Sequence, residues 1–104
     1  MLVADRMNGR VAVFTQAGAL LAEWKGLGLR PCALALGPGG TLYVSSHDAR
    51  SHENIVTIAR LSDGTPLETI DPALEGIDGL AVDRTGTVYA VSATARAVAR
   101  YQRR

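Results

Sequence analysis

An internal repeat constrains the fold of this chain more than any other feature of its sequence. Residues 77–91, IDGLAVDRTGTVYAV, alternate in character, are interrupted at 84–86, and resume with β-branched and aromatic side chains. This pattern predicts two strands joined by a tight turn at Gly86, because glycine adopts positive φ without a steric penalty. Residues 31–46, PCALALGPGGTLYVSS, are a degenerate copy. The matching positions, each 46 residues apart, are Leu34 and Leu80, Leu36 and Val82, Gly40 and Gly86, and Tyr43 and Tyr89.

A repeat of this length built from short strands is typical of propeller blades and related arrays. We therefore predict an all-β chain that forms about two and a half four-stranded blades of a β-propeller. Residues 1–28 would supply the last three strands of one blade, residues 29–73 a complete blade, and residues 74–104 the first three strands of a further blade. The predicted strands are 2–4, 10–15, 19–24, 32–36, 41–45, 55–61, 66–70, 80–83, 87–91 and 97–101.

Composition narrows the possible partners. The 104 residues amount to one small domain, and their 11 basic and 10 acidic side chains leave a formal charge of +1. That balance gives no electrostatic reason to expect nucleic acid or an anionic membrane as a partner. We also expect no membrane span, because no apolar run approaches the roughly 20 residues that a spanning helix needs. The sequence does not indicate a compartment.

The succession of antiparallel strands predicts where function would lie. Tight, glycine-marked turns would fall on one rim of the sheets, and the longer connections on the other rim. Loops on one rim usually carry function in such a scaffold. The rim with the longer connections collects the polar residues Asp5, Arg6, His47, Asp48, His52, Asp78, Ser92 and Thr94.

Two segments carry a resemblance to a known family. Residues 2–18, LVADRMNGRVAVFTQAG, and residues 79–89, GLAVDRTGTVY, resemble the NHL-repeat propellers. The chain as a whole is similar to the last blades of six-bladed propellers of the peptidyl-α-hydroxyglycine α-amidating lyase type. The resemblance implies that Arg6 corresponds to an active-site arginine of that family, with Asp5 beside it.

The same resemblance gives an incomplete metal site. The lyases bind zinc and calcium through a Met-Pro-His-Asp segment, which aligns here with residues 76–79. The histidine is replaced by Asp78 and the aspartate by Gly79, so zinc would lose an imidazole ligand. The family's other zinc ligands and its catalytic tyrosine would precede Met1. We therefore assign no metal ligand and no cofactor to this chain, and the resemblance implies ancestry more than activity.

Other polar residues allow two interpretations each. His47, Asp48, His52 and Glu53 share the segment 46–54 and could offer metal ligands, or could be a solvated loop. Arg6 could bind an anion, or could be a loop arginine that pairs with Asp5 or with an adjacent blade.

Three functions remain open at this stage. The chain could be a binding or scaffold module whose ligand, a small molecule or peptide, sits on the rim of the longer connections. Alternatively, it could be part of a lyase-like, metal-dependent enzyme whose site needs further blades, or it could close a ring from several copies. Its expected partners are thus the remaining blades or further copies of itself. We expect open strand edges at both ends of the array, and bare faces carrying Val11, Val13, Leu42 and Val88.

Overall fold

The chain folds into ten strands arranged as three antiparallel sheets. The structure, a computed structural model, describes residues 1–5, 9–25, 31–47, 54–70, 77, 79–92 and 96–102, without the side chains of residues 47 and 54. These residues contain strands and turns and no helix. The strands are β1 (Leu2–Asp5), β2 (Arg10–Phe14), β3 (Leu20–Trp24), β4 (Pro31–Gly37), β5 (Thr41–His47), β6 (Asn54–Arg60), β7 (Pro66–Ile70), β8 (Gly79–Val82), β9 (Val88–Ser92) and β10 (Ala97–Tyr101).

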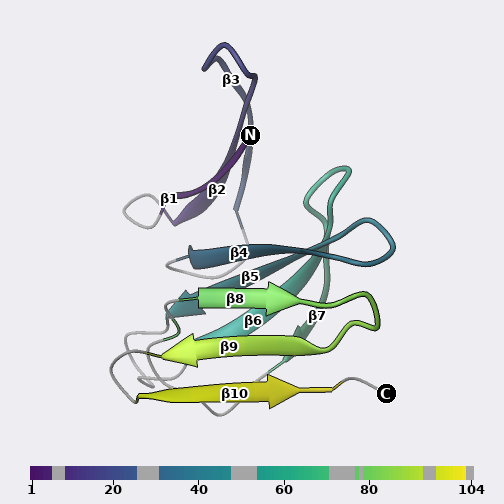
Figure 1. Cartoon of the computed structure of the whole chain (residues 1–104). Coiled ribbons are helices and arrows are strands. Elements are labelled where there is room, and N and C mark those ends of the chain that lie inside the picture. The colour runs from purple at the N-terminus through teal and green to yellow at the C-terminus, as the bar shows by residue number, and fades with distance from the viewer. Residues whose placement is uncertain are drawn as a thin grey trace.

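Consecutive strands pair throughout, so each sheet is a simple meander (Figure 1). The first sheet has the order β1-β2-β3, the central sheet β4-β5-β6-β7, and the third sheet β8-β9-β10. The predicted all-β class and all ten predicted strands are confirmed, with ends that differ by at most two residues. Thr15, Asp83 and Thr87 were expected in strands but lie between a strand and a turn, where Thr15 bonds to Ala19 and Asp83 bonds to Thr87.

The repeat seen in the sequence is reproduced in the strand register. Tyr43 lies opposite Ala35 in the central sheet, and Tyr89 lies opposite Ala81 in the third sheet. The turns that follow the first strand of each pair contain Gly40, with φ of 72°, and Gly86, with φ of 85°. Both pairs of strands are therefore the same local structure, in the same register, 46 residues apart.

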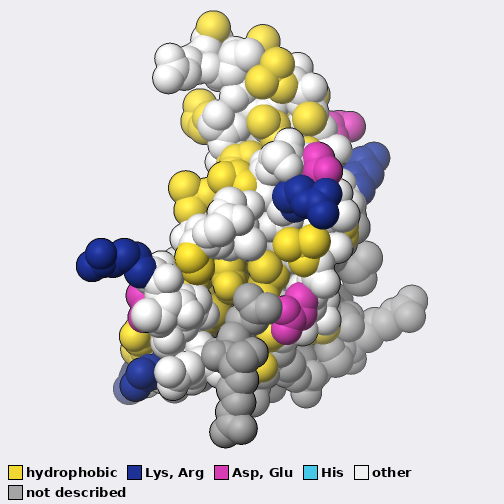
Figure 2. Space-filling model, turned by 90° about the vertical axis from the view of Figure 1, so that its right-hand side faces the viewer, with side chains coloured by type: hydrophobic (Ala, Val, Ile, Leu, Met, Phe, Trp, Pro, Cys, Tyr) yellow, Lys and Arg dark blue, Asp and Glu magenta, His cyan; other side chains and the backbone are white. Residues whose placement is uncertain are grey.

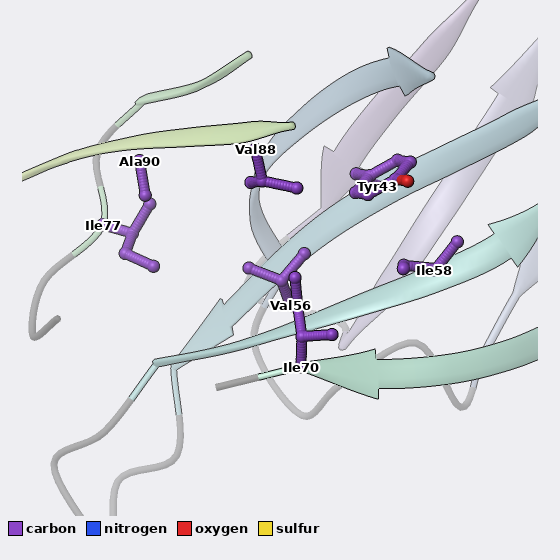
Figure 3. Packing of buried hydrophobic residues seen from close by; sticks show 7 residues of the cluster. All are labelled: Tyr43, Val56, Ile58, Ile70, Ile77, Val88 and Ala90. Atoms are coloured by element: carbon purple, nitrogen blue, oxygen red, sulfur yellow. The ribbon is translucent and has the colours of Figure 1, made fainter. Parts of the chain in front are cut away.

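The central and third sheets pack face to face through a hydrophobic cluster (Figure 3). On the central sheet, Tyr43 is 1% exposed and Val56 and Ile58 are also buried. Leu80 and Val82 of β8 and Ala99 and Tyr101 of β10 pack against this cluster, so three strands of the third sheet contribute to it. The seven fully buried members are Tyr43, Val56, Ile58, Ile70, Ile77, Val88 and Ala90.

The opposite face of the central sheet packs against the first sheet. Leu42, Val44 and Ala59 form this second cluster with Val11 of β2. Leu2, Trp24, Leu34 and Leu61 pack against it. Successive residues of a strand point to opposite faces, so β5 supplies Tyr43 to one cluster and its neighbours Leu42 and Val44 to the other. A sheet buried on both faces explains why Leu42, Tyr43 and Val44 form an uninterrupted apolar run in β5.

The expectation of bare faces around Val11, Val13, Leu42 and Val88 is wrong. Val11 and Val88 are 0% exposed and Leu42 is 1% exposed, because these three side chains lie between sheets. Val13 is half-buried. The prediction failed because it did not distinguish the faces that the three sheets bury against each other from the two outermost faces. The exposed hydrophobic side chains include Val3, Leu21, Leu36, Leu67, Val91 and Val98.

The sheets approach one another most closely through their first strands. Strands β4 and β8 lie in contact, as do β1 and β4, and β5 and β8. Among the described residues, β1 pairs only with β2 and β10 pairs only with β9, so each has an outer edge without a ladder partner.

Short turns with acidic side chains close the hairpins. The Asp83 carboxylate accepts hydrogen bonds from the Thr85 amide at 2.9 Å, the Thr85 hydroxyl at 2.7 Å and the Thr87 amide at 3.0 Å. These bonds, that from Thr85 foremost, lower the pKa of Asp83, because they stabilise the charged carboxylate. The residue that aligns with Asp83 in the other repeat is Gly37, whose missing side chain leaves room for the ring of Tyr43.

A second glycine permits contact between sheets. Gly64, in the turn between β6 and β7, has φ of 74°, and a Cβ atom there would meet the indole ring of Trp24 closer than real Cβ atoms approach. Gly39 also has positive φ, at 69°, but a Cβ atom on it would have open space around it. A side chain at Gly39 would therefore cause backbone strain alone, whereas a side chain at Gly64 would cause backbone strain and steric overlap with Trp24.

We predict that Gly64→Ala destabilises the protein more than Gly39→Ala. Both substitutions place a Cβ in the left-handed region, at a cost of about 1–2 kcal/mol. Only Gly64→Ala also forces Trp24 to move, which adds about 1–3 kcal/mol. Urea unfolding of the two variants measures the difference. Equal losses would show that Trp24 does not pack on this turn.

We predict that Asp83→Asn lowers the melting temperature at neutral pH and makes the melting temperature less sensitive to acid. Because the folded pKa of Asp83 is lowered, its ionised form contributes stability above the ordinary carboxyl pKa, and this contribution is lost as the pH falls below about 4 through the folded value. Thermal unfolding by circular dichroism from neutral to acidic pH, at one protein concentration, tests this. Thr85→Val, which removes one donor, should act in the same direction but more weakly. Parallel pH profiles for the wild-type protein and Asp83→Asn would contradict the prediction.

Candidate functional site

The rim opposite the tight turns carries a polar residue at one repeated position of each sheet. Asp5 pairs with Arg10, Ser46 with Ile55, and Ser92 with Ala97, where the second strand of each repeat ends and the third begins. Figure 1 shows β5 and β9 ending on the side away from the β4–β5 and β8–β9 turns. Ser46 is 6% exposed and Ser92 1%, so the strands end in buried polar groups at this rim, which we call the strand-end rim.

A further serine of this rim is tied to its neighbouring strand. Ser45 is fully buried, and its hydroxyl accepts a hydrogen bond of 3.1 Å from the Ala33 amide. The bond lies where the pairing of β4 and β5 shifts register between Pro31 and Ala33, so the serine hydroxyl replaces part of the backbone ladder. The described side chains of the protein contain no buried polar atom without a hydrogen-bond partner. The buried polar side chains described at the strand ends therefore have their hydrogen-bonding groups satisfied.

Asp5, Glu23 and Arg10 form an ion cluster on the outer face of the first sheet. The Arg10 Nε donates to Asp5 Oδ2 at 2.7 Å, and Arg10 Nη1 donates to Glu23 Oε1. The Arg10 side chain is 19% exposed and that of Asp5 is 23% exposed, whereas Glu23 at 41% reaches further into solvent. Three strands meet in this cluster, because Asp5 ends β1, Arg10 begins β2 and Glu23 lies in β3.

The charged groups of this cluster are one guanidinium and two carboxylates. Hydrogen bonding to Asp5, followed by the interactions with Glu23, raises the pKa of Arg10, so its guanidinium stays charged. One guanidinium is shared by two carboxylates, which leaves the cluster with a net charge of −1. The described ion-pair partner of Asp5 is Arg10. The predicted pairing of Arg6 with Asp5 or with an adjacent blade involves a residue outside the described part of the chain.

Most of the predicted site residues lie outside the described part of the chain. Arg6, Asp48, His52, Asp78 and Thr94 are in this group. His47 is placed by its backbone as the last residue of β5, opposite Asn54. Ile77, inside the segment that aligns with the lyase metal motif, is 2% exposed and belongs to the hydrophobic core. Across the residues described, no three His, Cys, Asp or Glu side chains are grouped so that they could hold a metal ion.

The turn-bearing side of the molecule has two hollows that the sequence did not predict. An apolar groove of about 430 Å³ runs between the first and central sheets. Figure 2 shows hydrophobic side chains reaching the surface through the middle of this side. The residues that line the apolar groove are Met1, Leu2, Leu34, Ala35, Leu36, Leu42 and Leu61. The available signal was the sequence ALAL at 33–36, which places apolar side chains on both faces of β4.

A second hollow of about 420 Å³ lies between the β4–β5 and β8–β9 turns. It is more polar than the first, because Asp83 and Arg84 contribute to its wall beside Leu36 and Val82. Leu36 lines both hollows and is 62% exposed. Neither hollow contains a titratable pair arranged for acid–base or nucleophilic chemistry, judged by the lining residues.

The fold and the site together define an all-β protein of three antiparallel sheets with a buried polar strand-end rim. A scan against protein-family models finds no match for this chain, and a search of curated proteins likewise returns none. Among the described residues, no helix has the length and apolar character needed to cross a membrane.

Proposed function

We propose that this chain is a binding or scaffold module whose sheets are blades of an NHL-like β-propeller. The observation that carries the proposal is the repetition of the contact between sheets. In the first sheet, Val11 pairs with Trp24, and both side chains pack on the central sheet. At the equivalent position of the central sheet, Val56 pairs with Ile70, and both side chains pack on the third sheet. Simple sandwiches bury one face of each sheet, whereas here the central sheet buries both.

The receiving faces repeat as well. Leu42 and Val44 of the central sheet receive the first sheet, and Val88 and Ala90, each 46 residues later, receive the central sheet. The close approach of β4 to β8 and of β1 to β4 supports sheets that radiate from a common axis. Repeated units that contact only their neighbours are the general organisation of such arrays.

The strand-end rim is the proposed ligand face. It presents Asp5 at the end of β1, His47 at the end of β5, and the end of β9. In the sequence, the connections after β1 and β5 include Arg6, Asp48 and His52, and Asp78 directly precedes β8. Binding residues concentrate on loops held by a rigid scaffold, and the buried serines provide that scaffold here. The ligand would be a small molecule or peptide. The alternative, a part of an amidating lyase-like enzyme, depends on Arg6 and on residues of further blades.

The first test of this proposal uses amide chemical shifts. A library of small molecules and short peptides is titrated into the isotope-labelled protein, and shifts are followed at Asp5, His47 and Ser92 on the strand-end rim. Gly18, Gly39 and Gly86, in the tight turns, serve as internal controls. We expect ligand-dependent shifts at the rim. Shifts confined to the turns, or no saturable shift with any compound, would contradict a ligand face at this rim.

The second test separates binding from catalysis. Incubation with a peptidyl-α-hydroxyglycine and zinc should release no amidated peptide, because Asp78 and Gly79 replace the family's histidine and aspartate. Chromatographic detection of the amidated product measures this, with zinc alone as the control. Turnover above the zinc control that is lost in Arg6→Ala would favour the lyase alternative.

A further inference from the structure

The outer face of the third sheet is the counterpart of a face that is buried in the central sheet. Val98 pairs with Val91 in the third sheet as Val56 pairs with Ser45 in the central sheet. Val56 and Ser45 are 0% exposed, whereas Val98 is 68% exposed and Val91 is 44% exposed. The same repeat position is thus fully covered in one sheet and open in the next.

The outer face of the first sheet is likewise open at a repeat position that is buried in the central and third sheets. Val3 pairs with Ala12 as Val44 pairs with Thr57 and as Ala90 pairs with Ala99. Val44 is 0% and Ala90 is 1% exposed, because each receives the preceding sheet, whereas Val3 is 40% exposed. Within the chain, Val11 shares a cluster with Val44 and Val56 shares one with Ala90. By the same register, Val98 is matched to Val3.

We propose that the third sheet of one copy of this chain docks on the first sheet of a second copy, head to tail, with Val98 facing Val3. This inference rests on the proposed blade repeat and not on any ligand at the strand-end rim. The contact would continue an interface that the chain already contains twice. Uncovered apolar faces of this kind mark protein–protein interaction sites.

Charge supports a second copy as the occupant. Arg100 takes the position of Ile58 on the outer face of the third sheet, since Arg100 pairs with Tyr89 as Ile58 pairs with Tyr43. It is exposed there. The facing surface of the first sheet holds the Asp5–Arg10–Glu23 cluster with its net charge of −1. By register, Arg100 lies two residues from Val98 toward the turns, whereas Asp5 and Arg10 lie two residues from the Val3–Ala12 pair toward the strand-end rim. The two outer faces nevertheless carry charges of opposite sign, which favours pairing of unlike faces over pairing of two like faces.

The geometry predicts a heterologous contact, in which the two partners use different faces. After a single contact, one copy keeps a free first sheet and the other a free third sheet, so association continues to a closed ring or an open assembly. This property distinguishes the proposal from a symmetric dimer through the third sheet alone, and it dictates the experiment.

Size-exclusion chromatography with light scattering on the full chain tests the proposal. The wild-type protein should associate as its concentration rises. Val98→Asp and Val3→Asp should each weaken association about a hundredfold or more, because each would bury an unpaired carboxylate at the contact. Leu67→Asp is the matched control: Leu67 is 51% exposed on β7, outside both faces, and this variant should associate like the wild type. Circular dichroism verifies that each variant is folded.

Mixing the two weakened variants gives the decisive result. Val98→Asp retains an intact first sheet and Val3→Asp an intact third sheet, so an equimolar mixture should form a one-to-one heterodimer and nothing larger. A wild-type chain that stays monomeric at the highest attainable concentration would overturn the proposal. Continued association of Val3→Asp alone, or absence of the heterodimer in the mixture, would also overturn it. None of these results depends on ligand binding at the strand-end rim, so the two proposals fail independently.

Discussion

Burial of the central sheet on both faces is the constraint on which the rest of the structure depends. A strand covered on one side alternates apolar and polar residues, but β5 must supply Leu42 and Val44 to one neighbour and Tyr43 to the other. Each outer sheet has one face that meets this core and one that does not. Their outward positions are consequently free to carry the ion cluster of the first sheet and the valines of the third.

The hairpin turns fix the strand register that this packing requires. A shift of one residue in a strand would move every side chain to the other face, so the hairpin turns must hold the pairing. Asp83 does so with three hydrogen bonds to the turn that it begins, and Asp63 accepts one from the Thr65 amide at 3.0 Å in the turn before β7. The hydrogen bonds from Thr65 lower the pKa of Asp63, as those from Thr85 lower that of Asp83. Local bonds at the hairpin ends thus support the long-range alignment of the sheets.

The sequence was sufficient to predict all ten strands, because period-two patterning and glycine turns are local signals. It also predicted the equivalence of Tyr43 and Tyr89, which the register reproduces. It could not predict the two partners of Arg10, since Asp5 and Glu23 reach Arg10 from either side only when three strands are aligned. The burial of Val11 and Val88 was missed for the same reason: a strand pattern shows that a face is apolar but not which neighbour covers it.

One pair of equivalent positions in the repeat, Asp83 and Gly37, carries residues with different structural roles. The Asp83 carboxylate accepts hydrogen bonds from its turn, and its Oδ2 lies 3.4 Å from the Tyr89 hydroxyl. At the equivalent position, Gly37 has no side chain, and the ring of Tyr43 fills that space. The two segments therefore differ in their local structure: an aspartate at position 37 would overlap the ring of Tyr43, and a glycine at position 83 would lose three hydrogen bonds of the turn. The repeat segments 31–46 and 77–91 are therefore not interchangeable. Duplication or shuffling of single units would disturb this protein more than its regular strand spacing suggests.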